Sequence, residues 1–68
     1  MKIFQKRLIE QRTINKLTQR QVADYLQIAQ PSYIRYENGS AEPNLENLVK
    51  LAELFDISVD YLLGRTNY

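Results

Sequence analysis

The sequence contains neither cysteine nor histidine, and it has only two glycines and two prolines among 68 residues. The absence of cysteine excludes disulfide bonds and thiolate metal sites together. Small secreted domains usually depend on disulfides, so we expect a cytoplasmic protein. Because histidine and closely spaced aspartates are both absent, we expect no metal and no other cofactor. No apolar run approaches the roughly 20 residues of a membrane span, and no signal peptide is recognisable, so we expect no membrane attachment.

The charge of the chain is unevenly distributed. Residues 1–35 hold seven bases and two acids, whereas residues 36–68 hold two bases and six acids. The two segments therefore carry +5 and −4, which agrees with the net charge of +1. This asymmetry predicts one face that attracts a polyanion, although ordinary scatter over a solvated surface would look similar.

Helix signals recur along the chain, and no alternating strand pattern competes with them. Phe4 and Leu8 lie four residues apart, on one face of a first helix. Thr18, followed three residues later by Gln21, is a capping box, which satisfies free backbone amides at a helix start. These two residues predict a second helix over about residues 18–26.

A third helix is predicted over about residues 30–37, after a turn of only three residues. Pro31 favours this start because its missing amide is not needed in the first helical turn. Gly39 is expected to end the helix in a left-handed conformation. Tyr33 and Tyr36, three residues apart, are expected to face the core, although tyrosines can also stack on bases.

Two further helices complete the predicted fold. Asn44 is expected to cap a fourth helix with one apolar stripe that faces the core. This stripe consists of Leu45, Leu48, Leu51, Ala52 and Phe55. Ser58 is expected to cap a short fifth helix, which Gly64 ends. No repeat or linker divides the sequence, so we predict a single all-α domain of five helices over residues 1–68.

Two short helices joined by a three-residue turn are typical of a helix-turn-helix, whose second helix enters the major groove of DNA. The segments Leu17–Ala23, Gln30–Gly39 and Ser58–Gly64, in this order, closely resemble the lambda-repressor and Cro-like family of the xenobiotic-response-element type. The resemblance covers residues 4–64. It implies a compact five-helix domain that binds double-stranded DNA and regulates transcription, localised in the cytoplasm on the nucleoid, rather than an enzyme.

By position, the resemblance also implies roles for individual residues. Three residues of the recognition helix would read base edges, namely Gln30, Pro31 and Arg35. Phosphate contacts would come from Thr18, Gln19, Arg20, Ser32, Asn38 and, secondarily, Arg12. Arg12 and Glu37 match an ion pair that ties the first helix to the end of the third. Each of these residues could instead be an ordinary surface residue, except that a structural role is favoured for the ion pair.

The sequence departs from the family pattern at four positions. Gln27 stands in the turn where glycine is common, and a left-handed conformation there would cost about 1–2 kcal/mol. Ala29 replaces the usual Ser or Thr cap of the recognition helix, which forfeits roughly 1 kcal/mol. The Pro31 side chain can make only apolar contacts, for example with a thymine methyl group. Glu42 stands where many relatives have lysine, which predicts a weak second phosphate clamp around Asn38 and moderate affinity.

The first functional hypothesis is a transcriptional repressor that acts as a homodimer on a palindromic operator. Dimerisation is expected because one short helix reads too few bases to be selective in a genome. The half-sites would lie about one helical turn apart, roughly 34–36 Å. Ile57, Val59 and Tyr61 are candidates for the dimer surface, although Ile57 and Val59 could simply belong to the core.

The alternative is an antitoxin or anti-repressor-like module, in which the same scaffold binds a partner protein. The acidic second half would suit a basic partner, and the neighbouring genes would separate the two hypotheses. Catalysis is disfavoured because no nucleophile–base pair or metal set is present. The sequence has no room for a sensing domain, so we expect either a minimal repressor or the DNA-binding part of a longer protein.

Overall fold

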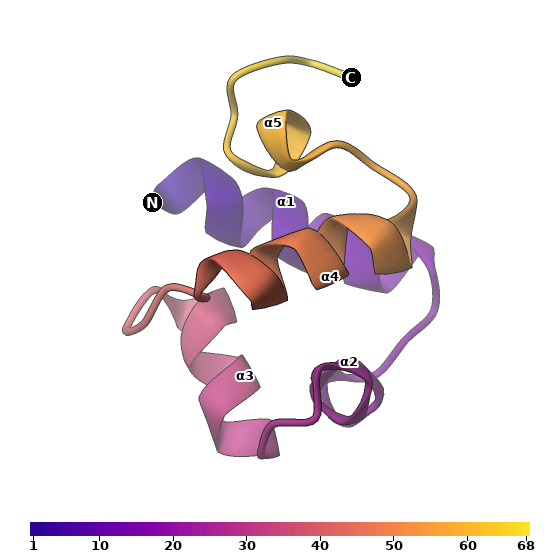
Figure 1. Ribbon diagram of the computed structural model, residues 1–68, viewed down its shortest axis with the longest axis vertical. Helices are drawn as coiled ribbons and strands as arrows, with labels where there is room; N and C mark the ends of the chain where they lie inside the picture. The colour runs from indigo at the N-terminus through magenta and orange to yellow at the C-terminus, as the bar shows by residue number, and fades with distance from the viewer.

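The computed structural model describes residues 1–68 and confirms an all-α fold of five helices. The helices are α1 (Lys2–Ile14), α2 (Gln19–Leu26), α3 (Gln30–Asn38), α4 (Leu45–Phe55) and α5 (Val59–Leu62). Figure 1 shows α2 and α3 at one end of the molecule and α5 at the other, with α1 and α4 between them. Both termini lie on the α5 side, so neither covers the outer surface of α2 and α3.

Local capping signals set the starts of three helices as predicted. The Thr18 hydroxyl accepts a bond from the Gln21 backbone N–H at 3.0 Å, and the Gln21 side chain accepts one from the Thr18 N–H at 2.8 Å. Asn44 and Ser58 cap α4 and α5 by accepting from the backbone N–H three residues later, at 2.8 and 2.9 Å. α3 follows Ala29 and has no side-chain cap, as expected.

Each helix is followed by a residue with left-handed backbone conformation. Gly39 and Gly64 fill this position after α3 and α5, with φ of 86° and 79°. Gln27 adopts it after α2, with φ of 59°, at the turn position where glycine is common in the family. Lys16 and Asp56 also adopt it, with φ of 57° and 53°, which the sequence did not indicate. Each of these three non-glycine residues carries a local strain of about 1–2 kcal/mol.

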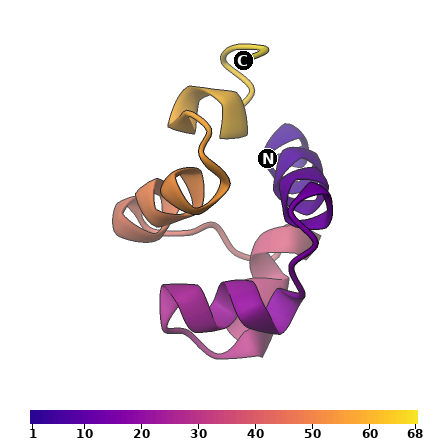
Figure 2. The same ribbon diagram turned by 90° about the vertical axis from the view of Figure 1, so that its right-hand side faces the viewer.

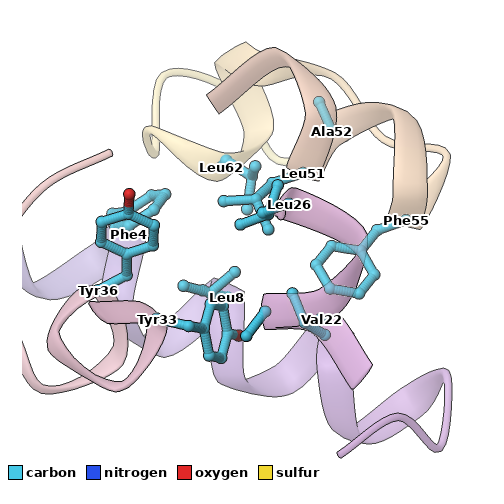
Figure 3. Close-up of a cluster of buried hydrophobic side chains, with 11 residues drawn as sticks. Phe4, Leu8, Val22, Leu26, Tyr33, Tyr36, Leu51, Ala52, Phe55 and Leu62 are labelled. Carbon is cyan, nitrogen blue, oxygen red and sulfur yellow. The ribbon is translucent and has the colours of Figure 1, made fainter. Parts of the chain in front are cut away.

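One hydrophobic core joins all five helices (Figure 3). It consists of Phe4, Leu8, Val22, Ala23, Leu26, Tyr33, Tyr36, Leu51, Ala52, Phe55 and Leu62. The two tyrosines face this core as predicted, and their rings pack edge to face with centroids 6.1 Å apart. Because both rings are buried, neither is available to stack on a nucleic-acid base.

The predicted apolar stripe of α4 is wrong at its first position. Leu45 is 81% exposed, whereas Leu51 is fully buried. Asn47 occupies the buried face of the first turn instead, and its amide donates to the Tyr36 hydroxyl at 3.3 Å. Val49, one turn after Leu45, is 49% exposed. The outer face of α4 therefore carries two uncovered aliphatic side chains.

The two leucines of α4 provide a matched test of this core. We expect Leu51→Ala to lower the free energy of unfolding by roughly 2–5 kcal/mol, because it leaves a cavity in a packed interior. Leu45→Ala should change it by less than about 0.5 kcal/mol, since that side chain is exposed. Urea unfolding followed by circular dichroism measures both variants, and equal losses would contradict the burial described here.

Candidate nucleic-acid interface

A short, well-bonded turn fixes the angle between α2 and α3. The backbone N–H groups of Gln27 and Ile28 donate to the carbonyls of Asp24 and Ala23 at 3.1 and 3.0 Å. Ala23 is 1% exposed, so its small side chain lets the chain pack closely at this point. The two helices cross at the end of the molecule that is opposite to α5 (Figure 2).

The outer face of α3 carries most of the predicted base-reading residues. Burial of its opposite face turns Pro31, Arg35 and Asn38 outward, at positions i, i+4 and i+7 of the helix. Gln30 is also exposed, at the start of the helix and beside this face. Ser32 is half-buried on the other flank.

The start of α2 lies beside the end of α3, where the Gln19 side chain bonds to Glu37, and offers donors for an anion. The backbone N–H groups of Gln19 and Arg20 stand in the first turn, where a helix leaves amides without intrahelical partners and has a positive dipole. The Arg20 side chain is exposed, as is Thr18, whereas Gln19 is half-buried. These groups could bind a phosphate.

The loop after α3 offers fewer donors than the resemblance implies. The N–H groups of Gly39 and Ala41 both donate to the Arg35 carbonyl, at 3.1 and 3.2 Å. The Asn38 side-chain oxygen accepts from the Ser40 N–H and hydroxyl at 2.9 and 2.7 Å. The side-chain amide nitrogen of Asn38 and the backbone N–H of Glu42 therefore remain as donors that this segment can present to a phosphate.

The structure brings Arg12 and Glu37 together in a two-bond ion pair between α1 and α3. The Arg12 Nε lies 2.6 Å from one carboxylate oxygen of Glu37, and Nη2 lies 3.2 Å from the other. A third donor of Arg12 bonds to the Leu17 carbonyl at 3.1 Å. Only 19% of the Arg12 side chain and 6% of the Glu37 side chain are exposed. The pair is therefore part of the folded interior.

Two further side chains bond to the same carboxylate, and the sequence did not reveal either contact. The Gln19 side-chain amide donates to Glu37 Oε1 at 3.1 Å, and the Tyr33 hydroxyl donates to Oε2. The spacing of Tyr33 and Glu37, four residues apart on one helix, could have indicated the second contact. The first spans two helices and has no comparable local signal.

These contacts determine the charge state of the cluster. Burial alone would raise the pKa of Glu37, but hydrogen bonds from Arg12, Tyr33 and Gln19 outweigh it and hold the pKa below its usual value. Burial raises the pKa of Tyr33, and the hydrogen bond to Glu37 raises it further, so the phenol keeps its proton. Glu37 is therefore an anion at neutral pH, bonded to a cation and two neutral donors.

Arg7 has a structural role that the charge count did not reveal. Its guanidinium donates to the backbone carbonyls of Tyr61 and Thr66 at 2.5 and 2.6 Å, and lies 4.2 Å from the centroid of the Tyr61 ring. Ile57 and Val59 are partly buried against the core. All three residues proposed for a dimer surface thus make contacts within the chain, and their role between subunits stays a prediction.

Comparison with known proteins identifies the class. The family model described as helix-turn-helix matches residues 8–62. The chain therefore belongs to the helix-turn-helix family of DNA-binding transcription regulators, of the lambda-repressor and Cro-like type, whose members are not enzymes. None of the five helices is long and apolar enough to cross a membrane.

Individual relatives agree with this class. The chain is 46% identical over 65 residues to the cryptic phage CTXphi transcriptional repressor RstR of Vibrio cholerae. It is 46% identical over 65 residues to the uncharacterized HTH-type transcriptional regulator YobD, and 42% identical over 66 residues to YqaE, both of Bacillus subtilis. Each match covers 96% of this chain but only 57–58% of the relative. No solved structure gives a significant match.

The buried ion pair predicts a pH-dependent loss on mutation. We expect Arg12→Ala to lower the free energy of unfolding at neutral pH by roughly 3 kcal/mol, because it leaves a buried carboxylate with fewer partners. Because folding lowers the pKa of Glu37, its ionised carboxylate stabilises the folded state above pH 4.5, the usual pKa of glutamate. This contribution is lost as the pH falls towards the lowered pKa. The free energies of unfolding of Arg12→Ala and of the wild type should therefore become more similar at acidic pH.

Urea unfolding between neutral and acidic pH measures this effect. Lys50→Ala is the control, because it removes a partly exposed ion pair with Glu46 on α4 and should lower the free energy of unfolding by less than about 1 kcal/mol. If Arg12→Ala were no more destabilising than this control, the Arg12–Glu37 pair would not have the structural role described above.

Proposed function

We propose that this chain is a sequence-specific DNA-binding domain of a transcriptional repressor, which places α3 in the major groove. The exposed face of α3, with Pro31 and Arg35 one turn apart and Gln30 beside them, is the observation that carries this proposal. A major groove about 12 Å wide admits one helix of this kind. The repressor role is supported by the name of RstR, which describes a transcriptional repressor.

The roles of the individual residues follow from chemistry and position. Gln30 can bond to adenine through its amide, and Arg35 can make paired bonds to guanine or hold a phosphate. Pro31 contributes apolar contact. The start of α2, with Thr18 and Arg20, contacts phosphates of the DNA backbone.

We further propose that two copies bind a palindromic operator. One copy of α3 spans too few base pairs for selective binding in a genome, so two recognition helices about one DNA turn apart are needed. Val59 and Tyr61 lie on α5, which is at the end of the molecule remote from α2 and α3 (Figure 1), and together with Ile57 they are the proposed dimer surface.

Selection from a pool of random duplexes at near-physiological salt tests the proposal directly. We expect enrichment of a palindrome whose half-sites are centred about one helical turn, roughly 34–36 Å, apart. Enrichment of a single half-site would refute the dimer but retain base reading. If no sequence were enriched and binding simply vanished with rising salt, only electrostatic attachment would remain, and a protein partner would be sought.

Gln30→Ala separates base reading from general attachment. We expect it to reduce the preference for the selected duplex over a random one by about 1–3 kcal/mol, and to change binding to the random duplex much less. Arg65→Ala is a control at an exposed site three residues after α5, and it should change binding to neither duplex. Fluorescence anisotropy measures both duplexes, and equal losses of Gln30→Ala on the two would remove Gln30 from base recognition.

A further inference from the structure

The Glu37 carboxylate does more than neutralise Arg12. Its Oε1 accepts from Arg12 at 3.2 Å and from Gln19 at 3.1 Å, while Oε2 accepts from Arg12 and Tyr33. The residue is 7% exposed, so these bonds occupy a carboxylate that water barely reaches. One buried anion therefore connects α1, α2 and α3.

The Gln19 amide is only partly used by this contact. Its nitrogen carries two protons, and a single bond, to Glu37, is formed within the chain. The second proton has no acceptor within the chain, and the residue is only half-buried. Gln19 is also the first residue of α2, beside the free backbone amides of that helix.

We propose that Glu37 is a positioning residue for DNA binding: it holds the Gln19 amide so that its second N–H is presented to a backbone phosphate. This inference rests on the function proposed above and extends it. Because Glu37 belongs to the recognition helix α3, its bond to Gln19 also fixes the position at which α2 binds a phosphate relative to that helix. A side chain that is held in advance also loses less conformational freedom when it binds.

A double-mutant cycle in DNA affinity tests this role. Gln19→Ala, Glu37→Gln and the double variant are titrated with the selected duplex and with a random duplex, below their melting temperatures. We expect each single variant to lose roughly tenfold in affinity on both duplexes, the effect of one hydrogen bond to a charged group. The double variant should lose no more than a single one, because Glu37 acts through Gln19.

Tyr33→Phe is the matched control. It removes a donor from the other oxygen of Glu37, so it should lower the melting temperature and leave the affinity within about twofold of wild type. A double variant whose losses multiply to roughly a hundredfold would overturn the inference. A Glu37→Gln variant with wild-type affinity would overturn it as well.

A measurement on the wild type keeps the inference testable if Glu37→Gln does not fold. In nuclear magnetic resonance spectra, one side-chain amide proton of Gln19 should keep its shift when duplex is added, and the other should move. If the proton bonded to Glu37 moved instead, Gln19 would leave Glu37 on binding, and the inference would be wrong. If the wild type bound no duplex at all, the proposed function itself would fail.

Discussion

Four hydrogen bonds converge on one buried carboxylate, that of Glu37, and three helices depend on it for their relative positions. A charge removed from water must be matched closely, because an unpaired one is strongly destabilising. Arg12 supplies the opposite charge from α1, and Gln19 and Tyr33 supply neutral donors from α2 and α3. The polar cluster and the hydrophobic core thus fix the same helix arrangement by different means.

That arrangement leaves one face for recognition. Burial of Tyr33, Tyr36 and Glu37 turns the opposite side of α3 outward, and the Gln19–Glu37 bond holds the start of α2 beside the end of this helix. The packing of the buried face of α3 therefore also determines where its exposed side chains lie. A substitution that reorients α3 in the core also moves Pro31 and Arg35 on the surface.

Features that depend on neighbouring residues could be predicted from the sequence, whereas features that depend on tertiary contacts could not. Thr18, Asn44 and Ser58 indicate helix starts, because a cap is a hydrogen bond between a side chain and the backbone N–H only three residues later. The burial of Leu45 was predicted wrongly, because spacing alone cannot show what packs against a first turn. In the candidate site, exposure of Gln30 and Arg35 follows from helix periodicity, but the Gln19–Glu37 bond joins residues 18 apart and needs the folded structure.

The internal use of two arginines changes what the charge asymmetry means. Arg7 and Arg12 are bound to carbonyls and to Glu37, so five of the seven bases in residues 1–35 stay free of such contacts. Only Arg20 and Arg35 of these lie on α2 and α3. A complex formed through this face would neutralise few phosphates and displace few condensed cations, each worth about 0.9 in the logarithmic salt slope. Its attachment to DNA would then depend on the fit of surfaces more than on the release of ions.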